Sequence, residues 1–270
     1  MPKITINGAE LYYEQHGSGE KTLVFAHSML FNCRMFDAQV AALKDRYRCL
    51  LYDFRGQGQS EITADGYDLD SLSEDAAELI ETLGNPPVHF LGFSMGGMVG
   101  LRLAIRRPEL LRSLMLLNTS ADPEGSENMR QAKMLRWATR WLGPRMTVGQ
   151  VMPFFFSEGC LKDPDRQDLV DEWRGHFMAN DRVGVSRAVQ GVLEREGVAG
   201  ELDKIQLPTL IISGENDLAT TPEKSQRMQA GIAGSLLVQI PRSGHMTPVE
   251  EPEAVNAALE AFLGEVDSEQ

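Results

Sequence analysis

The chain has 270 residues, of which 42% are hydrophobic and 24% are charged. These fractions are typical of globular proteins, and the apolar residues are enough to form a sizeable core, so the composition excludes a disordered or fibrous chain. Asp and Glu number 39 against 26 Lys and Arg, which gives a formal net charge of −13. Because such a field repels nucleic-acid phosphates and anionic lipid, we expect neither a nucleic-acid nor a membrane partner.

The acidity is concentrated in two segments. Residues 56–101 contain eight acidic residues and residues 243–270 contain seven, and neither segment contains Lys or Arg. We expect both to be largely helical and to form solvated outer faces. No apolar stretch approaches the roughly 18 residues of a membrane span, and the start of the chain lacks a basic region followed by an apolar one. We therefore expect an unprocessed cytoplasmic protein. The chain has only three cysteines and no C-x-x-C spacing, so we expect neither disulfides nor structural zinc.

The predicted strands come first as a hairpin and then as a parallel series. Residues 3–6 and 9–15 flank Asn7-Gly8, a dipeptide that favours a tight turn between antiparallel strands. Six short apolar runs follow, mostly separated by segments of helical period such as 69–83, and this alternation predicts a parallel sheet covered on both faces. These runs are 22–26, 48–52, 88–93, 113–118, 209–213 and 236–240.

The alternation stops between Asn118 and Leu207, where far more residues intervene than a crossover needs. We therefore predict a core of residues 1–120 and 207–270, interrupted by a helical cap at 121–206. The cap contains all three Trp residues and a run of Phe. Its helical spacing of Met and Trp residues is typical either of the insert's own core or of a face that lines an apolar pocket. In the second interpretation, Trp137, Trp141 and Phe155 contact the substrate.

Ser94 is the candidate nucleophile. It lies in Gly92-Phe93-Ser94-Met95-Gly96, between a predicted strand and the helical run 98–107. A serine on a sharp strand-to-helix turn needs small neighbours two residues away on either side, because the backbone passes close there. The turn would place its hydroxyl at the carboxyl end of the sheet, near the positive end of a helix.

A serine hydroxyl needs a base, and the base needs a third group to orient it. Of the five histidines, His245 follows the last apolar strand and so should lie at the same sheet edge as Ser94. Asp217 follows the strand before it, and the chain order Ser, Asp, His fits this arrangement. Glu215 and Asp122 are the competing acids.

The negative oxygen formed during acyl transfer needs two backbone N–H donors. One is expected from Met95, directly after the nucleophile. The second is expected from Met29, in the loop His27-Ser28-Met29-Leu30 that follows an early strand. His27 is interpreted as a residue that shapes this loop by hydrogen bonding.

These motifs together resemble the α/β-hydrolase superfamily across nearly the whole chain. The resemblance rests on His27, on the segment Asp53-Phe54-Arg55-Gly56-Gln57-Gly58-Gln59-Ser60, on the turn at Ser94, on Gly214–Asp217 and on Gly244-His245. It implies an eight-stranded, mostly parallel sheet with helices on both faces, and a structural role for the Asp53 segment. The family's usual glycine after the first His is Ser28 here.

Within the superfamily, residues 28–37 and 218–222 are similar to 3-oxoadipate enol-lactonases and related small carboxylesterases. The resemblance implies a serine hydrolase that cleaves carboxylic esters or lactones through an acyl-enzyme, with no metal or organic cofactor. Ser28 and Leu30 are candidate substrate contacts, and Arg34 could bind an anionic substrate group or form a structural ion pair. Cofactor-free perhydrolase or haloperoxidase activity, and a slow ligand-binding receptor, remain alternatives. The sequence leaves monomer and homodimer open.

Overall fold

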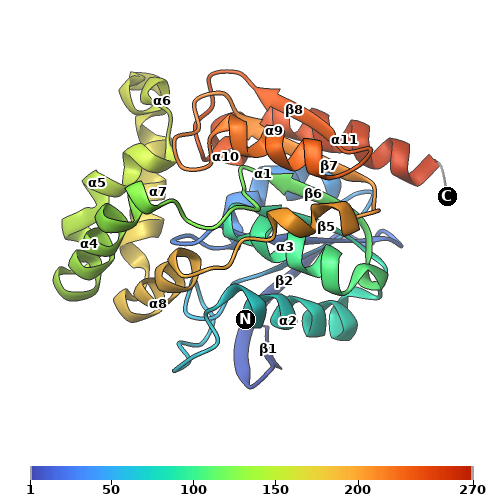
Figure 1. Cartoon of the computed structure of the whole chain (residues 1–270), viewed down its shortest axis with the longest axis horizontal. Coiled ribbons are helices and arrows are strands. Elements are labelled where there is room, and N and C mark those ends of the chain that lie inside the picture. Colours follow the sequence, from blue (N-terminus) through green and yellow to red (C-terminus); the bar gives the residue numbers. More distant parts are fainter. Residues whose placement is uncertain (1, 269–270) are drawn as a thin grey trace.

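An eight-stranded sheet forms the centre of the molecule (Figure 1). The structure, a computed structural model, describes residues 2–268, apart from the side chains of residues 126–128. The strand order is β1-β2-β4-β3-β5-β6-β7-β8. The strands are β1 (Lys3–Ile6), β2 (Ala9–His16), β3 (Thr22–Ala26), β4 (Arg48–Tyr52), β5 (Val88–Phe93), β6 (Leu111–Leu117), β7 (Thr209–Gly214) and β8 (Leu236–Ile240).

The first two strands form the predicted hairpin. Asn7 and Gly8 have φ angles of 44° and 75°, which is the left-handed backbone that this tight turn requires. β1 pairs antiparallel with β2, and β2 pairs antiparallel with β4. The remaining neighbours are all parallel. The eight-stranded, mostly parallel sheet is therefore confirmed.

Helices cover both faces of the sheet, because successive residues of the central strands point to opposite sides. Phe25 packs on the side of α1 (Asp37–Leu43) and α11 (Pro252–Ser268). Its neighbour Val24 belongs to the second core cluster, on the side of α2 (Leu69–Leu79), α3 (Met95–Arg106) and α9 (Pro222–Gly231). Strands buried on both faces explain why their sequences are continuous apolar runs.

The acidic segments are only partly the solvated faces expected from the sequence. The helix predicted at 69–83 is α2 followed by a π-helical turn at Ile80–Gly84. On α2, Asp75 is buried and pairs with Arg55 through two hydrogen bonds of 2.6 and 2.7 Å. Glu250, in the short helix α10 (Thr247–Glu250), is also buried. The prediction is wrong for these two carboxylates, because each meets donors from a distant part of the chain.

Five α-helices lie between β6 and β7, at the left of Figure 1, and are called the insert helices below. They are α4 (Ser126–Leu142), α5 (Pro144–Phe155), α6 (Glu158–Lys162), α7 (Gln167–Ala179) and α8 (Arg182–Leu193). α4 packs against α5 and α8, and α5 packs against α7. Among the described residues, no helix is long and apolar enough to cross a membrane.

Candidate active site

Ser94 occupies the sharp turn between β5 and α3. Its φ and ψ angles are 51° and −111°, a strained backbone for a residue with a side chain. Hydrogen bonds hold the turn: the Ser94 amide donates to the Leu117 carbonyl at 2.9 Å, and the Thr119 hydroxyl donates to the Ser94 carbonyl at 2.6 Å. A Cβ at Gly96 would collide with the backbone of Ala26 on β3. The small residue that the motif predicted is therefore required by close packing of α3 against the sheet.

The imidazole of His245 joins Ser94 to Asp217. Its Nε2 lies 2.9 Å from the Ser94 Oγ, and its Nδ1 lies 2.8 Å from the Asp217 Oδ2. Because a carboxylate only accepts, Nδ1 carries the proton and Nε2 is free to accept from the serine hydroxyl. All three side chains are at least 95% buried. The structure thus brings together the three residues predicted as nucleophile, base and acid.

The Asp217 carboxylate is held by more donors than the histidine alone. Oδ1 accepts from the amides of Ala219 and Thr220 at 2.8 and 2.9 Å, and Oδ2 accepts from the Thr220 hydroxyl and the Asn118 amide group at 2.7 and 2.9 Å. Burial raises the pKa of this carboxyl, but the facing His245 and these donors outweigh burial and lower the pKa below its usual value. Asp217 is therefore ionised at neutral pH.

The loop after β3 lines the same cavity as Ser94. The amides of Met29 and Met95 donate to no acceptor within the described part of the chain, and both residues line the cavity with Ser94. The next amide, of Leu30, is already taken by Gln57 at 2.6 Å. Gln57 was not singled out by the sequence, although it lies in the Asp53 segment. Its bond leaves Met29 as the available donor of this loop.

His27 fixes the loop from beneath. Its Nε2 accepts from the Phe54 amide at 2.9 Å, so its Nδ1 donates to the Ser28 carbonyl at 2.6 Å. Complete burial lowers the pKa of His27, which keeps the ring neutral as these bonds require. Asp53 supports the same region by accepting from the amides of Cys33 and Gln59, both at 2.9 Å. These contacts are the structural role expected for His27 and Asp53.

The other three histidines do not reach Ser94. His16 bonds to Glu14 at the edge of β2, and His89 is buried against Ser113. His176 on α7 meets the side chain of Asn32.

A cavity of about 210 Å³ opens over Ser94 and His245. Its walls are mainly apolar and come from the loop after β3, from the insert helices and from the loop after β7. Of the predicted substrate contacts, Leu30 and Phe155 line it. A few lining residues carry a charged or amide side chain: Glu124, Gln131, Arg136, Arg195 and Lys224.

The remaining predicted substrate contacts lie elsewhere. Ser28 is completely buried and is not among the cavity-lining residues. Arg34 is half exposed and forms ion pairs with Glu14 and Asp37 at 3.3 and 3.5 Å, outside the cavity. Of the two roles that the sequence left open for Arg34, the structure shows the ion pair.

Trp137 and Trp141 require a correction. They are 58% and 60% exposed, and neither lines the cavity. The side of α4 that faces the cavity carries Gln131, Leu135 and Thr139. The spacing of the Trp residues correctly indicated a helix face, but this face points away from both the cavity and the core of the insert.

Glu250 ties the insert helices to the loop that carries His245. Its carboxylate accepts from the Gly244 amide at 3.0 Å, from the Ser157 hydroxyl at 2.6 Å and from the Ser157 amide at 3.2 Å. Burial raises the pKa of Glu250 above its usual value despite these donors. No local pattern marks Glu250, because its partners are up to 93 residues away along the chain.

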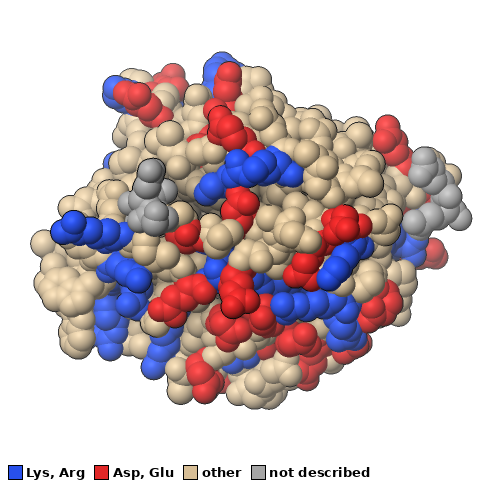
Figure 2. Space-filling model, in the orientation of Figure 1, with Lys and Arg blue, Asp and Glu red and all other residues tan. Residues whose placement is uncertain are grey.

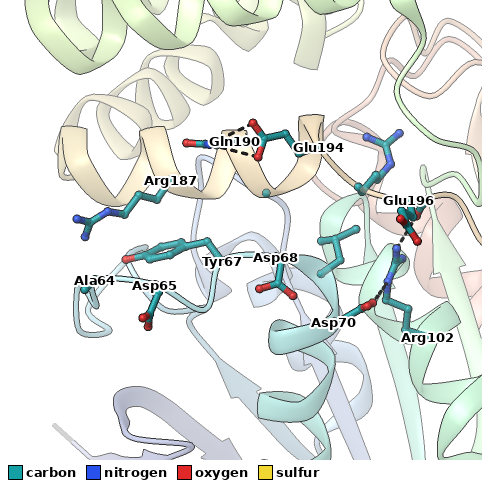
Figure 3. Close-up of a pocket in the computed structure, with 13 residues that line it drawn as sticks. Ala64, Asp65, Tyr67, Asp68, Asp70, Arg102, Arg187, Gln190, Glu194 and Glu196 are labelled. Atoms are coloured by element: carbon teal, nitrogen blue, oxygen red, sulfur yellow. Dashed lines mark hydrogen bonds and ion pairs between the residues drawn. The ribbon is translucent and has the colours of Figure 1, made fainter.

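A second cavity, of about 350 Å³, lies between the start of α2 and α8 (Figure 3). It is lined by charged side chains that already have partners. Arg102 bonds to Asp70 at 2.8 Å and to the Glu196 carbonyl at 2.6 Å, and Gln190 bonds to Glu194. The cavity is not lined by Ser94, Asp217 or His245. We assign no chemistry to this cavity.

Comparison with known proteins agrees with this geometry. The model of the alpha/beta hydrolase family matches residues 23–258. The chain is 29% identical to 3-oxoadipate enol-lactonase 2 of Acinetobacter baylyi, over 96% of this chain and 95% of that protein. It is 30% identical to a putative carbamate hydrolase, RutD, of Variovorax paradoxus, over 96% and 97%. A solved thermophilic esterase from Thermogutta terrifontis superimposes with a TM-score of 0.90 at 28% identity, covering 98% of both chains. The chain belongs to the alpha/beta hydrolase family.

Proposed function

We propose that the protein is a serine hydrolase that cleaves carboxylic esters or lactones through an acyl-enzyme intermediate. Ser94 attacks the ester carbonyl while His245 accepts its proton, and Asp217 stabilises the imidazolium that forms. The amides of Met29 and Met95 donate to the oxygen that becomes negative. His245 then passes the proton to the leaving alkoxide, and a water activated by the same imidazole releases the acid.

The observation that carries this proposal is the unbroken series of bonds Ser94–His245–Asp217, at 2.9 and 2.8 Å, which ends in an apolar cavity. Apolar walls strengthen the electrostatic interactions on which acyl transfer depends. The amides of Met29 and Met95, two residues that line the same cavity as Ser94, supply the donors that this reaction class requires.

The mainly apolar walls support substrates whose acyl or alcohol group is apolar. Two relatives that match this chain over nearly its whole length are named for an enol-lactone and for carbamates, and a structural neighbour is named an esterase. Lactones, carbamates and esters all contain an acyl carbon bound to an alkoxy or amino leaving group. We place esters and lactones first because the alkoxide leaves more readily and needs less assistance from the protein.

A panel of chromogenic short-chain esters, lactones and carbamates tests the proposal. The wild type is expected to hydrolyse at least one ester or lactone, and Ser94→Ala is expected to lose this activity by several orders of magnitude. Ser120→Ala is the matched control, since Ser120 is also buried near the same sheet edge but bonds to Asp122 rather than to a histidine.

Full activity in Ser94→Ala would refute the nucleophile, and inactivity of the wild type on the whole panel would refute the substrate class. Assays with and without added hydrogen peroxide separate hydrolysis from perhydrolysis, in which peroxide replaces water at the same acyl-enzyme. Tight binding of panel members without turnover would support a receptor instead.

A further inference from the structure

The outward face of α4 carries large apolar side chains in water. Met134, Trp137 and Trp141 are 67%, 58% and 60% exposed, and they lie three and four residues apart, so they share one side of the helix. Leu142 and Met146 continue the apolar surface with 58% and 68% exposure. Soluble chains rarely leave so many large apolar groups together on the surface unless the surface contacts something.

The same face is positively charged, in contrast to the rest of the chain. Residues 129–157 contain five Lys and Arg and no Asp or Glu. Arg130, Lys133 and Arg140 fall at helical positions beside the apolar stripe, and the Arg140 guanidinium lies 4.9 Å from the centre of the Trp141 ring. Figure 2 shows Lys and Arg separated by uncharged side chains at the left end of the molecule, where α4 lies in Figure 1.

We propose that this basic aromatic face, formed by Arg130, Lys133, Met134, Trp137, Arg140 and Trp141, docks on the surface of an anionic lipid membrane. A helix with Lys and Arg beside Trp and other apolar groups suits the boundary between lipid headgroups and acyl chains. Indole rings favour this boundary, because one part is apolar and the N–H stays hydrated. The helix would lie on the membrane, parallel to its surface.

The net charge of −13 does not oppose this contact at physiological salt. Charges farther apart than about 8 Å are largely screened, so the nearest charges decide the interaction. The acidic helix α11 lies at the opposite end of the molecule from α4 in Figure 1. The summed charge of the chain predicted no membrane partner, but docking depends on the charge of the face that meets the membrane.

A second copy of the chain fits this face less well. In a two-fold dimer the same patch meets itself, so the cations of one copy would lie against those of the other. A head-to-tail contact between this face and an acidic face would not close, and it would produce longer assemblies. An anionic lipid surface has neither restriction.

Vesicle binding tests the proposal. The full chain is mixed with phosphatidylcholine vesicles, with or without about one third phosphatidylglycerol, at about 0.1 M and about 0.5 M salt. We expect binding to the anionic vesicles at low salt, no binding to phosphatidylcholine alone, and release at high salt. Two of the three Trp residues belong to the face, so binding should also shift Trp emission to shorter wavelength.

Two sets of variants separate charge from apolar contact. Arg130→Gln with Lys133→Gln and Arg140→Gln should weaken anionic binding by about a hundredfold. Lys44→Gln with Arg46→Gln and Lys204→Gln removes the same charge from exposed sites outside the face and should change binding less than about twofold.

Trp137→Ser with Trp141→Ser should also weaken binding, whereas Ile62→Ser with Leu236→Ser, at two other exposed apolar sites, should not. Unchanged thermal unfolding would show that each variant is folded. The proposal would be overturned if the chain did not bind vesicles, if it bound neutral vesicles equally well, or if the face and control variants had equal effects. Self-association that only the face variants abolish, without vesicle binding, would assign the face to a second copy.

Discussion

Asp217→Asn changes which nitrogen of His245 carries the proton. In the wild type, Oδ1 of Asp217 faces two backbone amides, and Oδ2 faces Asn118 and His245. The single oxygen of the new side chain is required by the two amides, so its NH₂ group must face His245 Nδ1. That nitrogen then becomes an acceptor, the proton moves to Nε2, and the imidazole can no longer take the proton of Ser94.

The loss should be large, because the wrong tautomer in a Ser-His-Asp arrangement costs about 10⁴ in kcat, or about 5.5 kcal/mol of transition-state stabilisation. The NH₂ group would also face the Asn118 amide group, which adds a destabilisation of about 1–3 kcal/mol from unpaired donors. Ester hydrolysis and urea unfolding of the same preparation measure the two effects separately.

Asp122→Asn is the matched control. Asp122 was a competing candidate for the acid that orients the histidine, and in the structure it pairs with Arg227 instead. It should retain activity within about threefold. A loss of less than about tenfold in Asp217→Asn, or equal losses in both variants, would refute this role of Asp217.

Glu250→Ala should lower the free energy of unfolding by about 2–4 kcal/mol, because the donors of Ser157 and Gly244 lose their acceptor, and Glu250→Gln should cost less; urea unfolding measures both. Burial lowers the pKa of His89 to about 4, so its contribution to stability, about 3 kcal/mol, is present above pH 6.5 and is lost as the pH falls toward 4. His89→Gln should flatten this part of the unfolding profile, and an unchanged slope would contradict the assignment. Arg34→Ala should leave the preference between a carboxylate-bearing lactone and its methyl ester unchanged, since Arg34 lies outside the cavity.

The sequence predicted the sheet and the Ser94 turn well because both depend on local chemistry. The hairpin at Asn7-Gly8 requires left-handed backbone that these two residues adopt readily. The turn requires small residues beside Ser94, and the packing of Gly96 against β3 shows why. Such requirements act within a few residues, so the residue types alone reveal them.

The outer parts of the site were harder to predict because they depend on contacts between distant segments. Gln57 and Glu250 bond across 27 and up to 93 residues, and no local pattern signals either bond. The spacing of Trp137 and Trp141 indicates a shared helix face but not the direction in which that face points. Packing of α4 against α5 and α8 decides that direction.

Covalent labelling tests the central claim most directly. A phosphonate ester that reacts with activated serines should add one equivalent to the wild type, and peptide mass spectrometry should place the adduct on Ser94. His245→Ala should label far more slowly, because the Ser94 hydroxyl then has no base at 2.9 Å. An adduct on another residue, or equal labelling of wild type and His245→Ala, would contradict the assignment of Ser94 as a nucleophile activated by His245.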